Sequence, residues 1–372
     1  MKQIIFAALA LLMTACAATD KNSYKIVGTT TNIEDSAVVY LSTFDTNGTR
    51  IDSTVVTGGQ FEFTLPYDSL AQNAALLLSC PKDERTWASA LLYAEPGATI
   101  NVNLDMDEHA NCTVGGSPLN DKLQAHNNKV NTLTDEMMAA RKQLEDSTLT
   151  DELKAKAEAA ADSLYEAYIK LDEQLALDNM DNIIGVSQLI NRGAMFSNET
   201  RQKLVAMVPE KFQNLPGIVD VRKRLEAEAN TAEGKPFTDL EMPNPEGQMV
   251  KLSDYVAKSK LTLVDFWASW CGPCRAEIPG MKQIYADYRG RGLQLVGVSF
   301  DSKKEAWLGA IKEMQLDYPH MSDLKGWECA ASPIYNIQGI PFTLLVSQDG
   351  TIVGRNLHGD ELRQRIEELL SK

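Results

Sequence analysis

Residues 261–274 read LTLVDFWASWCGPC and decide the fold of the C-terminal part of the chain. The first seven residues are almost all apolar, which predicts a strand buried on both faces of a sheet. The last four form a Cys-x-x-Cys motif, and Pro273 suits the first turn of a helix because its missing N–H costs nothing there. The stretch therefore predicts a strand, a short loop and a helix whose N-terminus carries Cys271.

The two cysteines of this motif could be a redox pair or half of a zinc site. At a helix N-terminus, free N–H groups and the macrodipole favour a thiolate and lower a cysteine pKa from about 8.5 to roughly 3.5–7.5. We therefore expect Cys271 to be the nucleophile and Cys274, one turn further into the helix, to resolve the mixed disulfide. Zinc would need two more ligands, and the four histidines include no clustered pair. We expect no metal.

From about Gly234 onward, apolar strands alternate with helical segments. This alternation predicts an α/β domain whose sheet is covered on both faces. The Asp349-Gly350 turn predicts an antiparallel hairpin at one edge of that sheet. The expected strands are 261–267, 294–300, 343–347 and 351–354, and the expected helices are 277–289, 303–314 and 359–370.

Two segments resemble signatures of the thioredoxin family. Residues 264–275, VDFWASWCGPCR, resemble its active-site segment, and residues 339–343, GIPFT, resemble its second signature. The CRAEIP sequence at 274–279 is most similar to TlpA- and ResA-type membrane-tethered thiol-disulfide oxidoreductases. The resemblance covers residues 235–372 and implies a thioredoxin-like domain. No flavin or nicotinamide fingerprint is present, so the cysteine pair itself would carry the electrons without a cofactor.

The resemblance also implies roles for residues beside the cysteines. Pro341 would follow a cis peptide bond, shape the substrate groove and keep metal off the thiols. The backbone of Ile340 would pair with an extended substrate segment, and Trp270, Gly272 and Pro273 would complete the substrate-binding surface. The implied ligand is an extended protein segment that contains a disulfide.

Two carboxylates and a tryptophan near the motif each have two interpretations. Burial in an apolar strand would raise the pKa of Asp265 and suit it to accept the proton that Cys274 must lose, as the acid at the matching place of thioredoxins does. The alternative is a solvated carboxylate at a strand end. Glu277 would modulate the thiols like its family counterpart, or would be a solvated helix residue. Trp267 is expected either beside Trp270, as an apolar wall of the site, or in the core.

Residues 24–117 read as short β-strands separated by turns. Gly58-Gly59 supplies the positive φ that hairpin turns need, and QFEFTL at 60–65 alternates polar and apolar residues. We expect an all-β, antiparallel, sandwich-like domain, similar to the β-rich domain fused to such redox modules in exported bacterial lipoproteins. The expected strands are 37–43, 50–56, 60–65, 74–79, 88–94 and 99–104.

Residues 118–232 have the apolar period of helices. Two long segments flank the polar stretch 146–150, which predicts an antiparallel helical hairpin. Shorter helices are expected at 182–192 and 200–207. Nothing in residues 24–232 presents catalytic side chains.

Residues 1–17 are typical of a bacterial signal peptide. Lys2 precedes ten apolar residues, 4–13, which are too few to span a bilayer but match a signal-peptide core. Residues 12–16, LMTAC, resemble a lipobox, which implies lipidation of Cys16 and a lipid anchor in the membrane. Ordinary cleavage at the Ala-Cys-Ala sequence is the alternative.

The remaining cysteines outside the motif are Cys80, Cys112 and Cys329. In an oxidising compartment Cys80 and Cys112 could form a structural disulfide, although spacing alone does not bring their Cα atoms together. Cys329 is expected to be a small buried apolar residue.

Function is predicted from the motif, the export signal and the charge. The net charge of -15 and the lack of clustered Lys and Arg argue against a nucleic-acid partner. The leading hypothesis is a periplasm-facing, lipid-anchored enzyme of the cell envelope. It would reduce disulfides in exported proteins, including cysteines destined for cytochrome maturation, with electrons from a membrane dithiol donor.

Three alternatives remain open at this stage. The protein could be a disulfide oxidase or isomerase, because the potentials of such motifs span roughly -120 to -270 mV. A thiol peroxidase would need Thr and Pro ahead of its cysteine, and residues 267–271 have neither. The first 230 residues could instead make it a cell-envelope binding or scaffold protein whose redox domain is regulatory.

Overall fold

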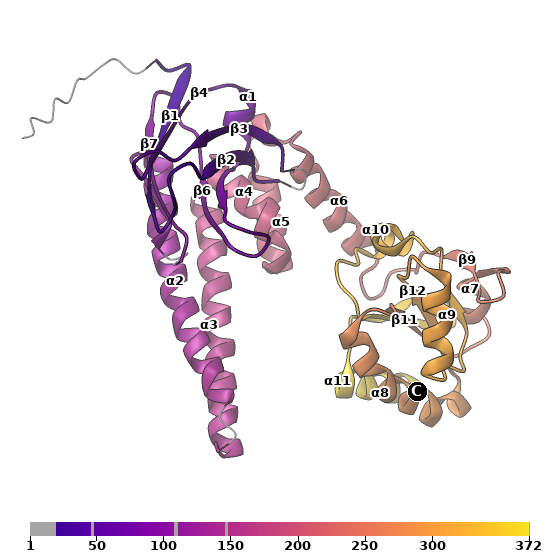
Figure 1. Ribbon diagram of the computed structural model, residues 1–372. Coiled ribbons are helices and arrows are strands. Elements are labelled where there is room, and N and C mark those ends of the chain that lie inside the picture. The colour runs from indigo at the N-terminus through magenta and orange to yellow at the C-terminus, as the bar shows by residue number, and fades with distance from the viewer. Residues whose placement is uncertain (1–19, 46–47, 108–110, 146–147, 372) are drawn as a thin grey trace, which may run out of the picture. The chain divides into compact units, whose positions relative to one another are not determined.

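The computed structural model describes residues 20–45, 48–107, 111–145 and 148–371 (Figure 1). The chain divides into two compact units, one ending at Val221 and the other beginning at Arg222. The predicted signal peptide and Cys16 lie outside the described residues. Within these ranges, no helix is both long and apolar enough to cross a membrane.

The N-terminal unit contains two four-stranded sheets. Its strands are β1 (Ser23–Thr31), β2 (Val38–Thr43), β3 (Arg50–Val55), β4 (Gln60–Pro66), β5 (Leu76–Pro81), β6 (Trp87–Leu92), β7 (Thr99–Asp105) and β8 (Thr113–Gly115), with the short helix α1 (Ser69–Asn73) between β4 and β5. The strand orders are β4-β1-β7-β8 and β3-β2-β5-β6. Buried residues alternate along strands such as β4, so each sheet turns one face to a shared core.

Strand β1 was not among the strands predicted from the sequence, because its alternation of apolar and polar residues stops at Gly28. Tyr24 and Ile26 face the core, and Gly28 continues the same face without a side chain. A Cβ on Gly28 would lie 2.0 Å from the ring of Phe61, which occupies that space. Glycine is therefore required here. Because β1 pairs in parallel with β7, the sandwich is mixed and not wholly antiparallel.

The helices of this unit pack on the sheets. They are α2 (Pro118–Leu144), α3 (Asp151–Asp178), α4 (Ile183–Arg192), the 3-10 turn η2 (Gly193–Met195), α5 (Asn198–Met207), the 3-10 turn η3 (Glu210–Phe212) and the first part of α6 (Pro216–Asn230), whose residues from Arg222 onward belong to the C-terminal unit. The predicted hairpin is formed by α2 and α3, whereas α6 was not expected. Leu123 of α2, Ala176 of α3 and Ile184 of α4 belong to the same core as the strands. The change of composition near residue 118 therefore separates strands from helices, but it does not separate two structural units.

The C-terminal unit is built on a five-stranded sheet of order β13-β12-β11-β14-β15. The strands are β11 (Leu261–Trp267), β12 (Leu293–Ser299), β13 (His320–Met321), β14 (Phe342–Ser347) and β15 (Ile352–Arg355), and β9 (Glu241–Pro243) pairs with β10 (Met249–Lys251) in a separate hairpin. The helices are α7 (Ser253–Val256), α8 (Gly272–Tyr288), α9 (Lys304–Glu313), α10 (Ala331–Tyr335) and α11 (Gly359–Leu370), with 3-10 turns η4 (Arg289–Arg291) and η5 (Gly326–Glu328).

The central strand β11 explains why this unit was predictable. All seven of its residues are buried, as the continuous apolar run indicates for a strand covered on both faces. It pairs in parallel with β12 and antiparallel with β14. The predicted α/β thioredoxin-like domain, preceded by a sandwich-like β region and a helical segment, is confirmed.

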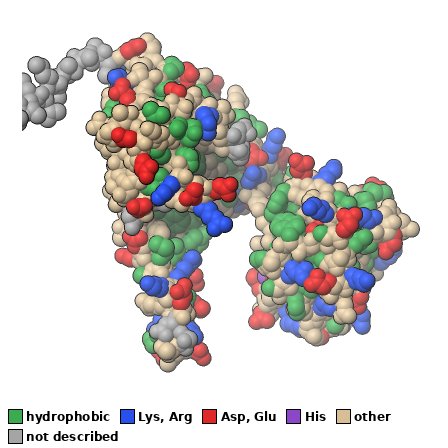
Figure 2. Space-filling model, viewed as in Figure 1, with side chains coloured by type: hydrophobic (Ala, Val, Ile, Leu, Met, Phe, Trp, Pro, Cys, Tyr) green, Lys and Arg blue, Asp and Glu red, His purple; other side chains and the backbone are tan. Residues whose placement is uncertain are grey.

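The surface carries mixed charge. On the face that Figure 2 shows, Lys and Arg side chains lie scattered among Asp and Glu and do not gather in one basic patch. The lack of a basic patch on this face is consistent with the acidic net charge of -15.

Candidate redox site

The two motif cysteines form a disulfide at the start of α8. Their sulfur atoms are 2.01 Å apart and their Cα atoms 5.3 Å apart. Cys271 is the N-cap of the helix, and its Sγ accepts a hydrogen bond from the backbone N–H of Cys274 at 3.1 Å. The helix therefore begins at Gly272, five residues before the expected start, because the cap lies within the motif. This N–H group and the helix dipole are the features that stabilise a thiolate at Cys271 in the reduced state.

The loop between β11 and α8 is held by a buried carboxylate, Asp301. Its two oxygens accept hydrogen bonds from the backbone N–H of Ser269 at 3.0 Å and from the Ser269 hydroxyl at 2.5 Å. The hydroxyl of Ser299 donates to the same carboxylate at 2.7 Å. Because Ser269 lies two residues before Cys271, these bonds position the reactive sulfur. Sequence reasoning missed Asp301, which lies 30 residues downstream of Cys271 and carries no recognisable motif.

The second signature lies against the disulfide. The Ile340–Pro341 peptide bond is cis, as the family resemblance implied. The carbonyl oxygen of Ile340 is 3.6 Å from the Sγ of Cys271. Residues almost 70 positions apart in the sequence thus meet at the reactive sulfur. Gly272 and Pro273 are both exposed on the first turn of α8, where a substrate can reach them.

Asp265 lies on β11, the strand that leads into the cysteine motif, and is 3% exposed. Burial raises its pKa to about 7, and the negative charge of Glu277 adds to the effect. The solvated alternative for Asp265 does not match this environment. A carboxyl that titrates near neutral pH can accept or return a proton at the pH of the reaction.

Asp265 belongs to a row of residues on three adjacent strands. In the register of the sheet, Asp265 of β11 pairs with Gly297 of β12, and Gly297 pairs with His320 of β13. Gly297 leaves room for the imidazole, since a Cβ there would lie 2.3 Å from Nδ1 of His320. Burial lowers the pKa of His320 to about 3, so the ring is neutral at physiological pH. Neither Gly297 nor His320 was identified from the sequence.

Glu277 contacts a residue that sequence reasoning missed. Its Oε1 is 2.8 Å from Nδ1 of His358, and Nε2 of His358 is 3.1 Å from the side-chain oxygen of Asn356. Glu277 is therefore not simply solvated, because it is held by the segment between β15 and α11.

The two tryptophans of the motif have different environments. Trp270 is 55% exposed, next to Cys271, whereas Trp267 is fully buried and packs against His320 with ring centroids 5.7 Å apart. Of the two expected wall residues, only Trp270 is at the surface, and Trp267 fills the core. The reason is that Trp267 is the last residue of β11, which is covered on both faces, whereas Trp270 lies beyond the end of the strand.

Among the residues that the structure describes, the cysteines outside the motif form no disulfide. Cys80 is buried in β5, and the sulfur of Cys112 lies 3.3 Å from the backbone nitrogen of Asp105. The disulfide considered for this pair is therefore not formed. Cys329 is fully buried, and burial raises the pKa of its thiol to about 12, which matches the expected apolar role.

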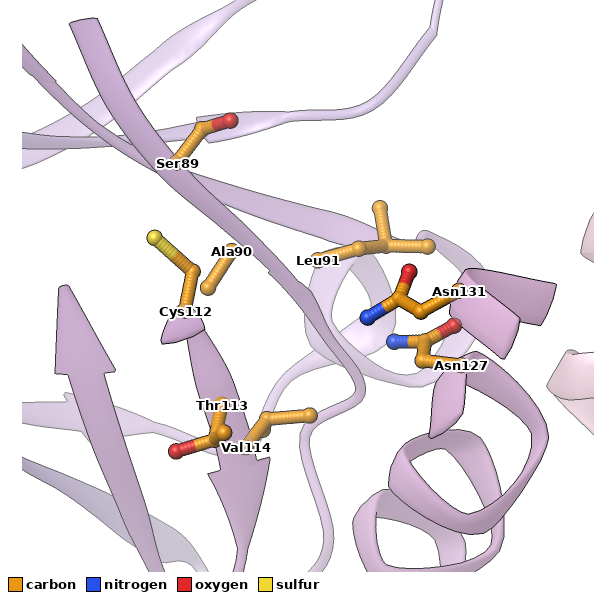
Figure 3. Close-up of a pocket in the computed structure, with 8 residues that line it drawn as sticks. All are labelled: Ser89, Ala90, Leu91, Cys112, Thr113, Val114, Asn127 and Asn131. Carbon is orange, nitrogen blue, oxygen red and sulfur yellow. The ribbon is translucent and has the colours of Figure 1, made fainter. Parts of the chain in front are cut away.

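A polar cavity of about 200 Å³ lies in the N-terminal unit. Its lining residues, between 89 and 131, precede the cysteine motif by more than a hundred positions. The cavity is lined by Asn127 and Asn131, one turn apart on α2, and, on the other side of the view in Figure 3, by Cys112. Among the residues that the structure describes, no group of three or more His, Cys, Asp or Glu side chains could hold a metal ion.

Comparison with known proteins identifies the family of the chain. The AhpC/TSA family matches residues 234–355, and a domain of unknown function, DUF4369, matches residues 24–123. The thioredoxin-like protein YneN of Bacillus subtilis (strain 168) is 33% identical over 128 residues, which are 34% of this chain and 71% of that protein. The chain belongs to the thioredoxin-like family.

Other thioredoxin-like proteins agree with this assignment. The thiol-disulfide oxidoreductase ResA of Bacillus thuringiensis subsp. konkukian (strain 97-27) is 28% identical over 139 residues, covering 37% of this chain and 77% of that protein. Among solved structures, the thioredoxin domain of a thiol-disulfide oxidoreductase from Bacteroides vulgatus is 32% identical, covers 37% of this chain and 98% of its own, and gives a TM-score of 0.35. The similarity to the ResA relatives confirms the predicted activity at the level of the class: this thioredoxin-like protein is a protein thiol-disulfide oxidoreductase.

Proposed function

We propose that this oxidoreductase acts as a reductase of disulfides in exported proteins, with Cys271 and Cys274 as its catalytic pair. The observation that carries the proposal is the cysteine pair at the N-terminus of α8, with the Ile340 carbonyl oxygen 3.6 Å from the Sγ of Cys271 and a buried carboxyl, Asp265, on the strand before the motif. Protein disulfides are the substrate class because the relatives that match are themselves thiol-disulfide oxidoreductases by name.

The first step is nucleophilic attack on the substrate. In the reduced protein, the Cys271 thiolate attacks one sulfur of the substrate disulfide, forms a mixed disulfide and releases the other sulfur as a thiolate. Backbone N–H groups at the start of α8 stabilise the Cys271 thiolate before the attack. Ile340 and Pro341 hold the substrate segment, together with the exposed Trp270, Gly272 and Pro273.

The second step resolves the mixed disulfide. Cys274 transfers its proton to Asp265 and attacks the Sγ of Cys271, which breaks the mixed disulfide and releases the second substrate thiolate. The substrate has then gained two electrons, and the protein carries the Cys271–Cys274 disulfide. Asp265 suits the proton transfer because its pKa of about 7 is close to the ambient pH. Glu277 acts on this step through its charge beside Asp265.

The location and electron supply complete the proposal. The apolar run at 4–13 and the LMTAC sequence at 12–16 support export and lipidation of Cys16. A lipid anchor would hold the protein on the periplasmic side of a membrane of the cell envelope, where a membrane dithiol donor would return two electrons to Cys271–Cys274. Cysteines destined for cytochrome maturation are one class of substrate that such a reductase would serve.

The redox potential of the Cys271/Cys274 pair tests the direction of electron flow. Equilibration of the purified chain with dithiothreitol or glutathione buffers measures it, and Cys271→Ser is the control that removes the couple. We expect a value near or below about -250 mV, because a reductase needs a pair that is harder to reduce than its substrates. A value near -120 mV would contradict the reductive role and support a disulfide oxidase or isomerase.

A further inference from the structure

A second tryptophan, Trp327, lies at the surface beside the motif. Its side chain is 48% exposed, and its ring centroid is 6.1 Å from that of Trp270, which is itself 55% exposed. Trp270 directly precedes Cys271 in the chain, whereas Trp327 comes from η5, between β13 and α10. The inner side of Trp327 rests on the buried Phe300, with ring centroids 5.5 Å apart. Two exposed indoles thus lie side by side, and one of them belongs to the residue directly before Cys271.

The segment that carries Trp327 is held in place by hydrogen bonds. The carboxylate of Asp323 accepts from the backbone N–H groups of Lys325 at 3.1 Å and Ala330 at 2.9 Å. Gly326 has a φ of 59°, a conformation that glycine adopts without strain and that turns the chain just before Trp327. Two residues later, Cys329 is fully buried. These hydrogen bonds, the turn at Gly326 and the buried Cys329 therefore fix the backbone in a conformation that leaves Trp327 exposed.

Exposed indoles in this position point to a partner that covers them. Trp is enriched among the residues that dominate binding at protein interfaces, since a large apolar ring gains most when it is desolvated. Any protein segment that reaches Cys271 must pass the residues around it, which include Ile340, whose carbonyl oxygen is 3.6 Å from the sulfur, and Trp270, its neighbour in the chain. Because the indoles carry no charge, the part of the segment that contacts them is expected to be apolar.

We propose that Trp327 and Trp270 together form a docking surface for an apolar side chain next to the reacting cysteine of a protein substrate. This inference rests on the proposed function and adds a sequence preference to it. Trp327 is the residue that decides the preference, because it is outside the cysteine motif and takes no part in the bond exchange.

The test uses the reduced full-length chain and two disulfide-linked peptides that differ only in the residue before the cysteine, Leu in one and Asp in the other. Trp327→Ala is expected to slow the reaction with the Leu peptide about fivefold to thirtyfold, as for the loss of one buried interface contact. Its rate with the Asp peptide and with bis(2-hydroxyethyl) disulfide is expected to change less than about twofold.

Two further variants keep the result interpretable. Trp327→Phe should recover most of the preference for Leu, and Met249→Ala, which alters another exposed apolar residue, on β10, should leave the rates with both peptides unchanged. Equal loss with all three disulfides, or no loss with any, would overturn the docking role of Trp327. If the wild-type chain reduced none of the three disulfides, the proposed function itself would fail.

Discussion

Asp265 is a carboxyl of the site whose environment differs strongly from that of a free side chain. It is buried in β11, and burial together with the Glu277 charge raises its pKa to about 7. In the unfolded chain an aspartate has a pKa of about 3.9. The folded state therefore binds more protons than the unfolded state between about pH 4 and pH 7. Its free energy of unfolding must fall as the pH rises through this window.

Replacement of this carboxyl should remove the pH-dependent penalty. We expect Asp265→Asn to raise the free energy of unfolding of the oxidised protein at pH 8 by about 1–4 kcal/mol and to change it little at pH 4, where the wild-type carboxyl is already protonated. Denaturant unfolding at both pH values measures the effect, and the exposed Asp360→Asn is the control. A destabilised variant at pH 8 would show that Asp265 is stabilised as a carboxylate. The same variant should also slow the attack of Cys274 on the mixed disulfide.

At the scale of elements, the strands β11, β12 and β13 place Asp265, Gly297 and His320 in one row. Partners in a parallel ladder project to the same face of a sheet, so the side chain that Gly297 lacks would lie between the other two. The His320 ring occupies that space. The glycine is therefore a packing requirement of β12, whose other residues favour a buried strand.

A methyl group at Gly297 should disturb this row. Because its Cβ would lie 2.3 Å from Nδ1 of His320, we expect Gly297→Ala to lower the free energy of unfolding by about 1–3 kcal/mol, measured by urea denaturation. The matched control is Gly309→Ala on α9, where no atom lies within 4 Å of the added Cβ. That variant should gain about 0.5–1 kcal/mol from helix propensity.

The contact with His320 can be isolated by a double variant. Gly297→Ala with His320→Ala should be less destabilised than the sum of the two single variants, because the clash is absent once the ring is removed. Strictly additive energies would contradict the assignment of the clash to His320.

At the scale of the whole molecule, α6 joins the two compact units, since the boundary between Val221 and Arg222 lies within it. Its second half is bonded to the C-terminal unit: Arg224 donates to Gln338 at 2.9 Å, and Asn336 donates to Glu228 at 2.7 Å. Residues 222–230 thus belong structurally to the redox unit, although their helical sequence pattern resembles that of the preceding helices.

Two fragments test this division. Residues 216–372 should unfold with a free energy about 1–2 kcal/mol higher than residues 231–372, because the shorter fragment lacks the hydrogen bonds of α6. The longer fragment should keep the redox potential of the full chain within about 15 mV. Urea denaturation and dithiothreitol equilibration measure the two quantities. A shift of more than about 30 mV would indicate that the N-terminal unit acts on the redox site and would favour its regulatory interpretation.

The sequence alone determined the redox chemistry of the cysteine pair and the central strand of the domain that carries it. The run of β11 predicted a buried central strand because five of its seven adjacent residues are apolar and point to both faces of the sheet, so both faces must be covered. The cysteine motif predicted the reactive pair, and the two family signatures predicted Ile340–Pro341 beside it. These features depend on neighbours in the chain or on an order of motifs, so a linear pattern can carry them.

Only the tertiary structure decided which distant residues complete the site. Asp301, His320, Trp327 and His358 reach the cysteines or the residues around them from other strands and loops, and no spacing in the sequence relates them to Cys271. The same holds for Gly28, whose missing side chain makes sense only against the ring of Phe61 on the neighbouring strand. The identity of such residues depends on the packing space and the hydrogen-bond partners around them. Both exist only after the fold has brought distant segments together, so the linear sequence does not show them.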